Sequence, residues 1–330
     1  MNPKVSILVP IYSVSQYIEK CAISLFEQTF HDIEFIFVND ATPDDSMEKL
    51  QKVIENFPDL RNQIRIIHQK INKGLAATRN IALDASQGDY IAVIDSDDYI
   101  DRDMIEILYA KAIESNSDIV VSDIIFEYND HETVIHEKVP EYQKDYFSDM
   151  ILNDHFHGFL CNKLIRRNLY ILPECRVPEG LNYFEDRYVM TRLCYFAEKI
   201  SKVDKAFYHY VQYNSNAITK TKNRMHFENV IRFWNDLDNF LKVRDEFIKY
   251  KSVMELPKVQ SKINLFIDTH SSQLRKDYRD LFFEEETNCI QYFKRGEKLM
   301  LLLVRYRMFA IAQLFHIYLI FRHKKLLNKQ

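Results

Sequence analysis

The segment Asp89-Tyr-Ile-Ala-Val-Ile-Asp-Ser-Asp-Asp98 joins a short apolar run to a cluster of carboxylates. Tyr90 to Ile94 has the length and composition of a buried strand. Three acids, Asp95, Asp97 and Asp98, follow at the point where this strand ends. The segment therefore predicts a strand that delivers acidic side chains to one edge of a sheet.

Strands and helices alternate around this segment over the first 125 residues. The alternation predicts an α/β fold, in which a largely parallel, Rossmann-like sheet carries helices on both faces. Ser13 with Gln16 indicates a capping box for the first helix, and Thr42-Pro43 indicates the start of the second. The expected strands are Val5–Val9, Ile33–Val38, Ile64–Ile67, Tyr90–Ile94 and Asp118–Ser122, and two further expected helices are Leu75–Ala85 and Arg102–Ser115.

The pattern changes near Phe126 and again near residue 216. Residues 126–215 mix short strands with helices, and residues 216–330 are almost entirely helical in pattern. We therefore expect three regions: 1–125, 126–215 and a helical C-terminal region at 216–330.

Polar side chains follow three of the expected strands. They are Tyr12-Ser13, Asn39-Asp40 and the acidic cluster that begins at Asp95. Ligands of open α/β sheets bind beyond the carboxyl ends of the strands, so these residues mark the expected binding edge.

The acidic cluster itself indicates a metal site. Neighbouring carboxylates repel one another, so one must take a proton or a cation must lie among them. Oxygen ligands suit a hard divalent ion, Mn²⁺ or Mg²⁺, which would also neutralise a bound diphosphate. The alternative is that these acids, together with Asp101, only complement the dipole of the following helix.

Three further positions allow two interpretations each. Asp40 is either a turn residue or an acceptor for a base or ribose. Arg79 lies either on a solvated helix face or against a phosphate or base, since a guanidinium matches oxyanions bidentately. The pair Glu185-Asp186 either complements a helix dipole or takes part in catalysis.

Composition excludes several classes of protein. A net charge of −4 argues against nucleic-acid binding as the main task. The five glycines form neither a dinucleotide-binding nor a P-loop motif. The five scattered cysteines and the short run Val5 to Ile11, which does not resemble a secretory signal, lead us to expect a reduced, cytoplasmic protein.

The motifs, taken in order, resemble those of the family 2 glycosyltransferases, which adopt the GT-A fold. The resemblance spans about the first 215 residues. It is carried by Val5-Ser-Ile-Leu-Val-Pro-Ile-Tyr12, Phe37-Val-Asn-Asp40, Asn72-Lys-Gly74, Ala77-Thr-Arg-Asn80, Ile94-Asp-Ser-Asp-Asp98, Cys161-Asn-Lys-Leu164 and Phe184-Glu-Asp186.

The resemblance implies an inverting enzyme that uses a nucleotide diphosphate sugar, usually a UDP-sugar. Residues 1–125 would bind this donor, and residues 126–215 would bind the acceptor and carry the catalytic base. The implied catalytic residues are Asp186 as the base and Glu185 beside it. The implied nucleotide-binding residues are Pro10, Tyr12, Asp40, Arg79 and Asp95, and the implied metal ligands are Asp97, Asp95 and Asp98.

The sequence departs from the family pattern near the end of the expected catalytic domain. The stretch Tyr208-His-Tyr-Val211 lacks the arginine that often follows the second tyrosine, which puts phosphate contacts from this region in doubt. The Gln-x-x-Arg-Trp motif of processive synthases is also absent. A transferase that adds one sugar is therefore expected, acting on a glycan or lipid-linked acceptor in bacterial surface polysaccharide assembly.

The C-terminal tail is basic and apolar. Residues 294–330 hold nine Lys or Arg against one acid, Glu297, and Leu299 to Phe321 is mostly apolar. Arg305 and Arg307 inside this stretch argue against a spanning helix. The pattern favours an amphipathic helix on an anionic membrane surface, which would make the protein peripheral on the inner face of the cell membrane. The alternative is a helix packed on protein.

Two rival functions remain at this point. A sugar-phosphate nucleotidylyltransferase also uses a Rossmann-like sheet with acidic metal ligands, but it normally has a Gly-rich loop where this chain has Pro10-Ile-Tyr-Ser13. A non-catalytic scaffold protein could keep the nucleotide pocket without any transfer.

Overall fold

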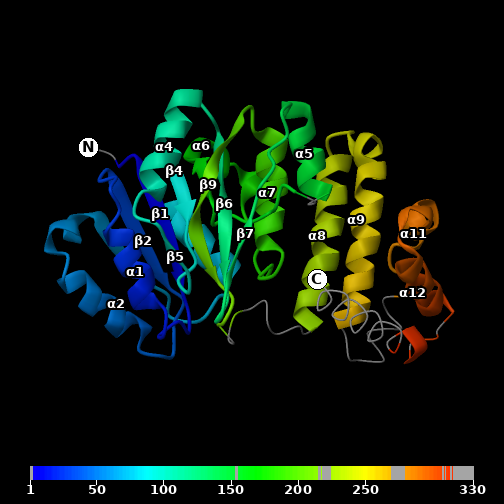
Figure 1. Cartoon of the computed structure of the whole chain (residues 1–330), viewed down its shortest axis with the longest axis horizontal. Helices are drawn as coiled ribbons and strands as arrows, with labels where there is room; N and C mark the ends of the chain where they lie inside the picture. Colours follow the sequence, from blue (N-terminus) through cyan, green and yellow to red (C-terminus); the bar gives the residue numbers. More distant parts are fainter. Residues whose placement is uncertain are drawn as a thin grey trace. The chain divides into compact units, whose positions relative to one another are not determined.

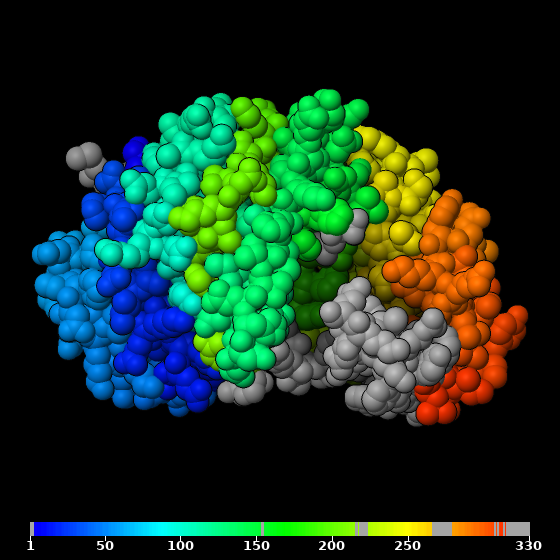
Figure 2. All heavy atoms as spheres, viewed as in Figure 1, coloured from blue at the N-terminus to red at the C-terminus, as the bar shows by residue number. Residues whose placement is uncertain are grey.

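The computed structural model describes residues 3–152, 155–214, 217, 224–268, 279–306, 308, 310–312 and 314. The chain divides into two compact units, Met1–Lys220 and Thr221–Gln330. The division of the first unit into a donor-binding and an acceptor-binding half stays a prediction. Figure 2 shows that segments from both predicted halves, blue to cyan and green, adjoin on the surface of the first unit.

A mixed sheet forms the centre of the first unit (Figure 1). Its strand order is β3-β2-β1-β4-β8-β6-β9-β5, with β7 paired to β6. The first four strands are parallel, β8 is antiparallel to both β4 and β6, and β9 is again parallel to β6. The strands are β1 (Val5–Ile11), β2 (Ile33–Asn39), β3 (Ile64–His68), β4 (Tyr90–Val93), β5 (Tyr99–Ile100), β6 (Ile119–Glu127), β7 (Glu132–Ile135), β8 (Lys163–Arg166) and β9 (Ile200–Val211).

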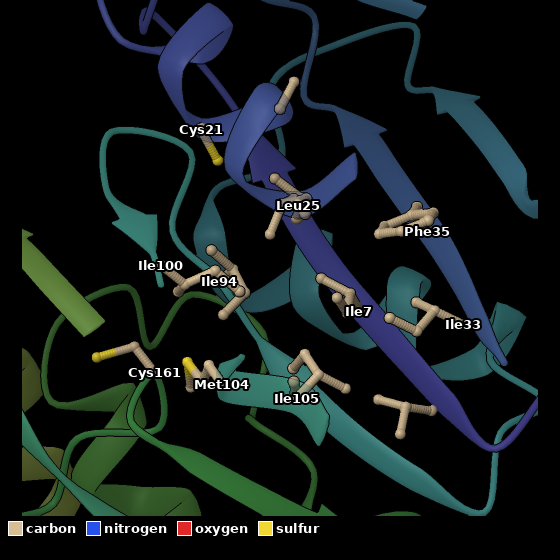
Figure 3. Packing of buried hydrophobic residues seen from close by; sticks show 14 of the residues in the cluster. Ile7, Cys21, Leu25, Ile33, Phe35, Ile94, Ile100, Met104, Ile105 and Cys161 are labelled. Atoms are coloured by element: carbon tan, nitrogen blue, oxygen red, sulfur yellow. The ribbon is translucent and has the colours of Figure 1, made fainter. Parts of the chain in front are cut away.

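Helices cover both faces of this sheet because strand side chains alternate between the faces. The odd-numbered residues of β1 and β2 pack with helices α1, α2 and α4, and Figure 3 shows Ile7, Leu25 and Ile105 in this core. Helix α3 lies against β1 and β2 through its own buried residues. The helices of this unit are α1 (Ile18–Phe26), α2 (Ser46–Glu55), α3 (Leu75–Ala85), α4 (Met104–Ser115), α5 (Gln143–Leu152), α6 (Arg167–Tyr170) and α7 (Glu185–Phe196).

Two predicted helix starts are wrong. The capping box at Ser13 does not form, because Ser13 has a φ of 55° and its N–H donates to Thr42 Oγ1 at 2.8 Å. Helix α2 begins at Ser46 rather than after Thr42, because Asp44 accepts hydrogen bonds from Thr42 Oγ1 and from the Ser46 N–H and holds a turn before the helix. Both segments therefore bind each other instead of capping helices.

The second unit is helical. Its longer helices are α8 (Arg224–Lys242), α9 (Phe247–Asp268), α11 (Phe283–Cys289) and α12 (Arg295–Arg305). Val259 and Ile263 of α9 pack with Met300, Leu301 and Val304 of α12. Within the described part of the chain, none of the helices has the length and apolar character needed to cross a bilayer. Most of the basic tail, including Arg307 and everything after Leu314, lies outside the described residues.

Candidate active site

Three neighbouring parallel strands bring the predicted binding residues to one edge of the sheet. β1 pairs with β2 on one side and with β4 on the other, so the segments that follow Ile11, Asn39 and Val93 leave the sheet together. Tyr12 is exposed at this edge, and Pro10 is buried in β1 opposite Val38. The structure thus places these residues at or beside the carboxyl ends of neighbouring strands, and their role in binding stays a prediction.

Asp40 is buried and holds the next loop along this edge. Its Oδ1 accepts hydrogen bonds from the Lys73 N–H at 2.7 Å and from Gln69 Nε2 at 2.9 Å. Its Oδ2 accepts the Gly74 N–H at 2.8 Å. The carboxylate therefore fixes the loop before α3, and its predicted contact with a base stays a prediction.

Gly74 is required where this loop meets the segment before α7. Its φ of 85° and ψ of 166° lie in a region that essentially only glycine adopts. A Cβ at this position would come within 2.4 Å of the side chain of Asn182. Asn182 in turn accepts the Ala76 N–H at 3.0 Å, so the start of α3 and the approach to α7 are held together here.

Arg79 of α3 joins the predicted catalytic and binding acids. Its side chain is 3% exposed, and its Nη1 donates to Glu185 Oε1 at 2.8 Å and also to Asp186 Oδ1. Its Nη2 donates to Asp95 Oδ1 at 2.8 Å. These three carboxylates hold the pKa of the guanidinium well above its ordinary value although burial opposes the charge. Arg79 thus links β4 to α7, and its predicted contact with the nucleotide stays a prediction.

The acids at the start of α7 are not ordinary surface carboxylates. Burial first, and the charge of Asp186 second, raise the pKa of Glu185 to about 7. Burial and the nearby charge of Asp95 also raise the pKa of Asp186, while Arg79 opposes the rise. The Asp186 side chain is 25% exposed and the Glu185 side chain 12%, so Asp186 is the more accessible acid.

Asp97 and Asp98 have different surroundings although they are adjacent. Asp98 is buried, and its two oxygens accept hydrogen bonds from Tyr208 Oη at 2.6 Å and the Val211 N–H at 2.8 Å. Asp97 is half-buried and accepts a hydrogen bond from Asn214 Nδ2 at 2.8 Å. Burial and the charge of Asp95 raise the pKa of Asp97 to about 6. Asp98 therefore contacts the end of β9, whereas Asp97 is the more exposed of the two carboxylates.

The donor atoms of the acidic cluster suit a divalent cation in kind, although among the described residues no three of these acids bring ligand atoms within 4.8 Å of one another. Five carboxyl groups lie around Arg79 or beside its partner Asp95, and one guanidinium balances only part of their negative charge. They belong to Asp95, Asp97, Asp98, Glu185 and Asp186. All of the available donor atoms are oxygens, which Mn²⁺ and Mg²⁺ prefer. A cavity of about 350 Å³ opens beside Asp97, lined also by Tyr17, Lys20 and Tyr213.

Several residues of the site were not predicted. Tyr208 and Val211 position Asp98, and Asn214 positions Asp97. The sequence signal for the first two is the stretch Tyr208-His-Tyr-Val211, which the family pattern links to phosphate contacts instead. Asn182 had no signal of its own. Direct contacts join Arg79, Asp95, Glu185 and Asp186, whereas Pro10, Tyr12 and Asp40 lie at neighbouring strand ends.

Comparisons with known proteins show the family of this chain. The model of the family described as Glycosyl transferase family 2 matches residues 6–171. A protein of Bacillus subtilis (strain 168) named as a glycosyltransferase, EpsH, is 30% identical over 277 residues, which cover 82% of this chain and 76% of EpsH.

Solved structures share the fold. The structure of S. aureus TarS residues 1–349 in complex with UDP-GlcNAc matches with a TM-score of 0.72 at 18% identity, covering 94% of this chain and 90% of that one. The mannosyltransferase PcManGT of Pyrobaculum calidifontis, in complex with GDP-Man and Mn²⁺, matches with a TM-score of 0.50 at 16% identity over 100% and 89% of the two chains.

Fold, acidic site and comparisons together define a glycosyltransferase of the GT-A fold with added C-terminal helices, as the sequence predicted. The chain belongs to glycosyl transferase family 2.

Proposed function

We propose that this glycosyltransferase inverts the anomeric centre and transfers one sugar from a nucleotide diphosphate donor, a UDP-sugar first of all, to an acceptor hydroxyl. One observation carries the proposal. Arg79 holds the candidate base Asp186 and the first acid of the strand-end cluster, Asp95, on one buried guanidinium. The base and the donor-binding acids are therefore fixed relative to each other before any substrate binds.

Asp186 is the proposed general base. As the acceptor oxygen attacks the anomeric carbon, its proton passes to the Asp186 carboxylate. The bond from the anomeric carbon to the diphosphate oxygen breaks on the opposite face, and the nucleoside diphosphate leaves with the bonding electrons. One displacement inverts the centre, so an α-linked donor gives a β-linked product. Arg79 favours the ionised form of Asp186, which the base needs before each transfer.

Asp97 is the proposed main ligand of the divalent cation, with Asp95 beside it. A cation bound there supplies positive charge for the leaving diphosphate, which the carboxylates alone would repel. Asp98 was also expected among the ligands. Its two oxygens accept hydrogen bonds from Tyr208 Oη and the Val211 N–H, which hold the carboxylate next to Asp97, and we keep Asp98 among the proposed ligands.

Uracil is the proposed base of the donor nucleotide. The TarS structure holds UDP-GlcNAc and the PcManGT structure holds GDP-Man, so the shared fold accepts more than one base. Asp40, Tyr12 and Pro10 lie at the strand ends where a base would bind. We place uracil first because of the family resemblance carried by the motif around Asp40.

A glycan or lipid-linked acceptor of bacterial surface polysaccharide assembly is the proposed acceptor class. The support lies in the second unit, where α12 leaves Leu299, Leu302 and Tyr306 exposed at i, i+3 and i+7 spacing. These residues would let the protein rest on the inner face of the cell membrane. Arg305 of the same helix instead pairs with the buried Glu286 at 2.7 Å and faces the helical core.

Calorimetric titration with UDP, with and without Mn²⁺, tests the proposal. We expect binding that requires the metal, and we expect Asp97→Ala to lose the metal-dependent part. Unchanged affinity in that variant would refute the ligand role of Asp97. If UDP fails in both conditions while GDP or dTDP binds, the donor base is corrected but the reaction class stands.

A further inference from the structure

A second group of side chains that could bind a metal ion is separate from the ion pairs that Arg79 makes with Asp95, Glu185 and Asp186. Glu127 ends β6, Glu132 begins β7, and His209 lies on β9. One ligand atom from each of these three residues lies within 4.8 Å of the other two. Glu127 and Glu132 also face each other directly in the antiparallel β6–β7 pair. Like charges at opposed positions destabilise a sheet unless a cation lies between them.

The imidazole of His209 is oriented as a ligand. Its Nε2 lies 3.1 Å from Asp101 Oδ1, and a carboxylate only accepts, so Nε2 carries the proton. Its Nδ1 then points a lone pair at Glu127 Oε2 across 3.9 Å, which is too long for a hydrogen bond. Among the described residues, this buried Nδ1 has no hydrogen-bond partner. A carboxylate behind a histidine that offers its other nitrogen is the usual arrangement in metal sites.

Glu127 is held in place by its own neighbours. Tyr99 Oη donates to its Oε2, and Tyr213 Oη donates to its Oε1 at 3.2 Å. The Tyr99 ring also stacks on His209, with centroids 4.2 Å apart and an interplanar angle of 12°. Lys20 Nζ lies 3.7 Å from Glu127 and balances one of the two glutamates. The charge of the second glutamate is left for another cation.

We propose that Glu127, Glu132 and His209 bind a divalent transition-metal ion of the Zn²⁺ type, distinct from the cation at Asp97. An imidazole with two carboxylates suits Zn²⁺, whereas Mg²⁺ prefers oxygen ligands alone. The ion would join β6, β7 and β9. Tyr99 and Tyr213 also line the cavity beside Asp97, so the ion would stiffen one wall of that cavity. The site does not depend on the proposed donor or mechanism.

The rival explanation is a proton on Nδ1, which would make His209 an imidazolium between Asp101 and Glu127. Zinc titration separates the two. We would titrate Zn²⁺ calorimetrically into the wild type, Glu132→Gln and Asp97→Ala, each in excess Mg²⁺. Glu132 is exposed, so its substitution leaves the fold intact. We expect one Zn²⁺ per chain in the wild type and in Asp97→Ala, and binding weaker by at least about tenfold in Glu132→Gln.

A second measurement follows the ion without calorimetry. Zn²⁺ should raise the Tm of the wild type and of Asp97→Ala, and His209→Gln should lose this rise if it folds. Equal affinity in the wild type and Glu132→Gln would overturn the proposal. Loss of zinc binding in Asp97→Ala would place the ion in the active site and also overturn it. A wild type that binds no Zn²⁺ at micromolar concentration would favour the imidazolium.

Discussion

Asp186 and Glu185 are neighbours in sequence and share Arg79, and we propose that Asp186 is the one that takes a proton from the acceptor. Asp186 is twice as exposed as Glu185, whose carboxyl is enclosed and has its pKa raised to about 7. Asp186→Asn keeps the size of the side chain but cannot accept the proton. We expect turnover to fall by at least about 100-fold with UDP affinity unchanged. The matched variant Glu185→Gln should lose less, and near-normal turnover in Asp186→Asn would exclude it as the base.

Arg79 favours the ionised form of the proposed base, Asp186. Because Arg79 opposes the burial that raises the pKa of Asp186, removing its charge should raise that pKa further. The base works in its ionised form, so activity falls as pH drops through this pKa. We therefore expect the acidic limb of the pH profile of kcat/KM to move to higher pH in Arg79→Met.

The control for this prediction is Arg79→Lys, which keeps the charge but loses the fork that reaches three carboxylates. Its acidic limb should stay closer to that of the wild type even if its activity is low. An unmoved limb in Arg79→Met would mean that another group sets the profile. Circular dichroism would first establish that both variants fold, because Arg79 is buried.

At this scale the motifs predicted acids that lie together in the structure, but not the contacts that hold them, and their roles stay predictions. Asp95, Asp97, Glu185 and Asp186 were predicted from motifs and lie together. The ion pairs of Arg79 with Glu185 and Asp186 could not be predicted, because these residues lie more than 100 positions from Arg79 in the chain. The difference between Asp97 and Asp98 depends on Tyr208, whose partner no local pattern specifies.

Among the elements, the loop before α3 tolerates little change at Gly74. Gly74→Ala meets two obstacles, a φ of 85° and the side chain of Asn182. We expect the free energy of unfolding of the first unit to fall by about 1–3 kcal/mol from the backbone conformation alone. The clash should add to this loss. UDP affinity should also fall, because Asp40 accepts the Gly74 N–H.

A double-mutant cycle in urea separates the two obstacles. Asn182→Ala removes the clash and one hydrogen bond to Ala76. Gly74→Ala should therefore cost less in the Asn182→Ala background than in the wild type. An equal cost in both backgrounds would assign the whole effect to the backbone, and no cost in either would contradict the conformation of this loop.

The elements themselves were predicted better than their ends. The first four strands of the sheet follow from apolar runs of strand length, and all four lie where they were expected. β8 was missed, and it is the strand that separates β4 from β6. Its short apolar stretch follows Lys163, which is buried and donates to Asn162 Oδ1 at 2.8 Å. A buried lysine with tertiary partners gives no strand signal.

At the scale of the whole molecule, the exposed face of α12 tests the proposal that the protein rests on a membrane. Its buried residues pack on α9, and its exposed residues Leu299, Leu302 and Tyr306 form an apolar face. Burying one leucine in a bilayer is worth about 1.5–3 kcal/mol. That value applies to a fully exposed leucine and Leu302 is 38% exposed, so Leu302→Glu should weaken sedimentation with phosphatidylglycerol vesicles by at least about threefold, and circular dichroism would establish that the variant folds.

The added negative charge would by itself reduce binding to anionic vesicles, so a charge-matched control is needed. Val243→Glu makes the same change at an exposed apolar residue that follows α8 and lies outside α12. It should lose only the part of the binding that the added charge removes, so it should sediment better than Leu302→Glu, and high salt should weaken the vesicle binding of both variants because screening acts on the basic residues of the tail. If Leu302→Glu and Val243→Glu behave alike, α12 makes no membrane contact and its apolar face is covered by protein. In that case a lipid-linked acceptor loses its structural support, while the transferase chemistry at Asp186 is unaffected.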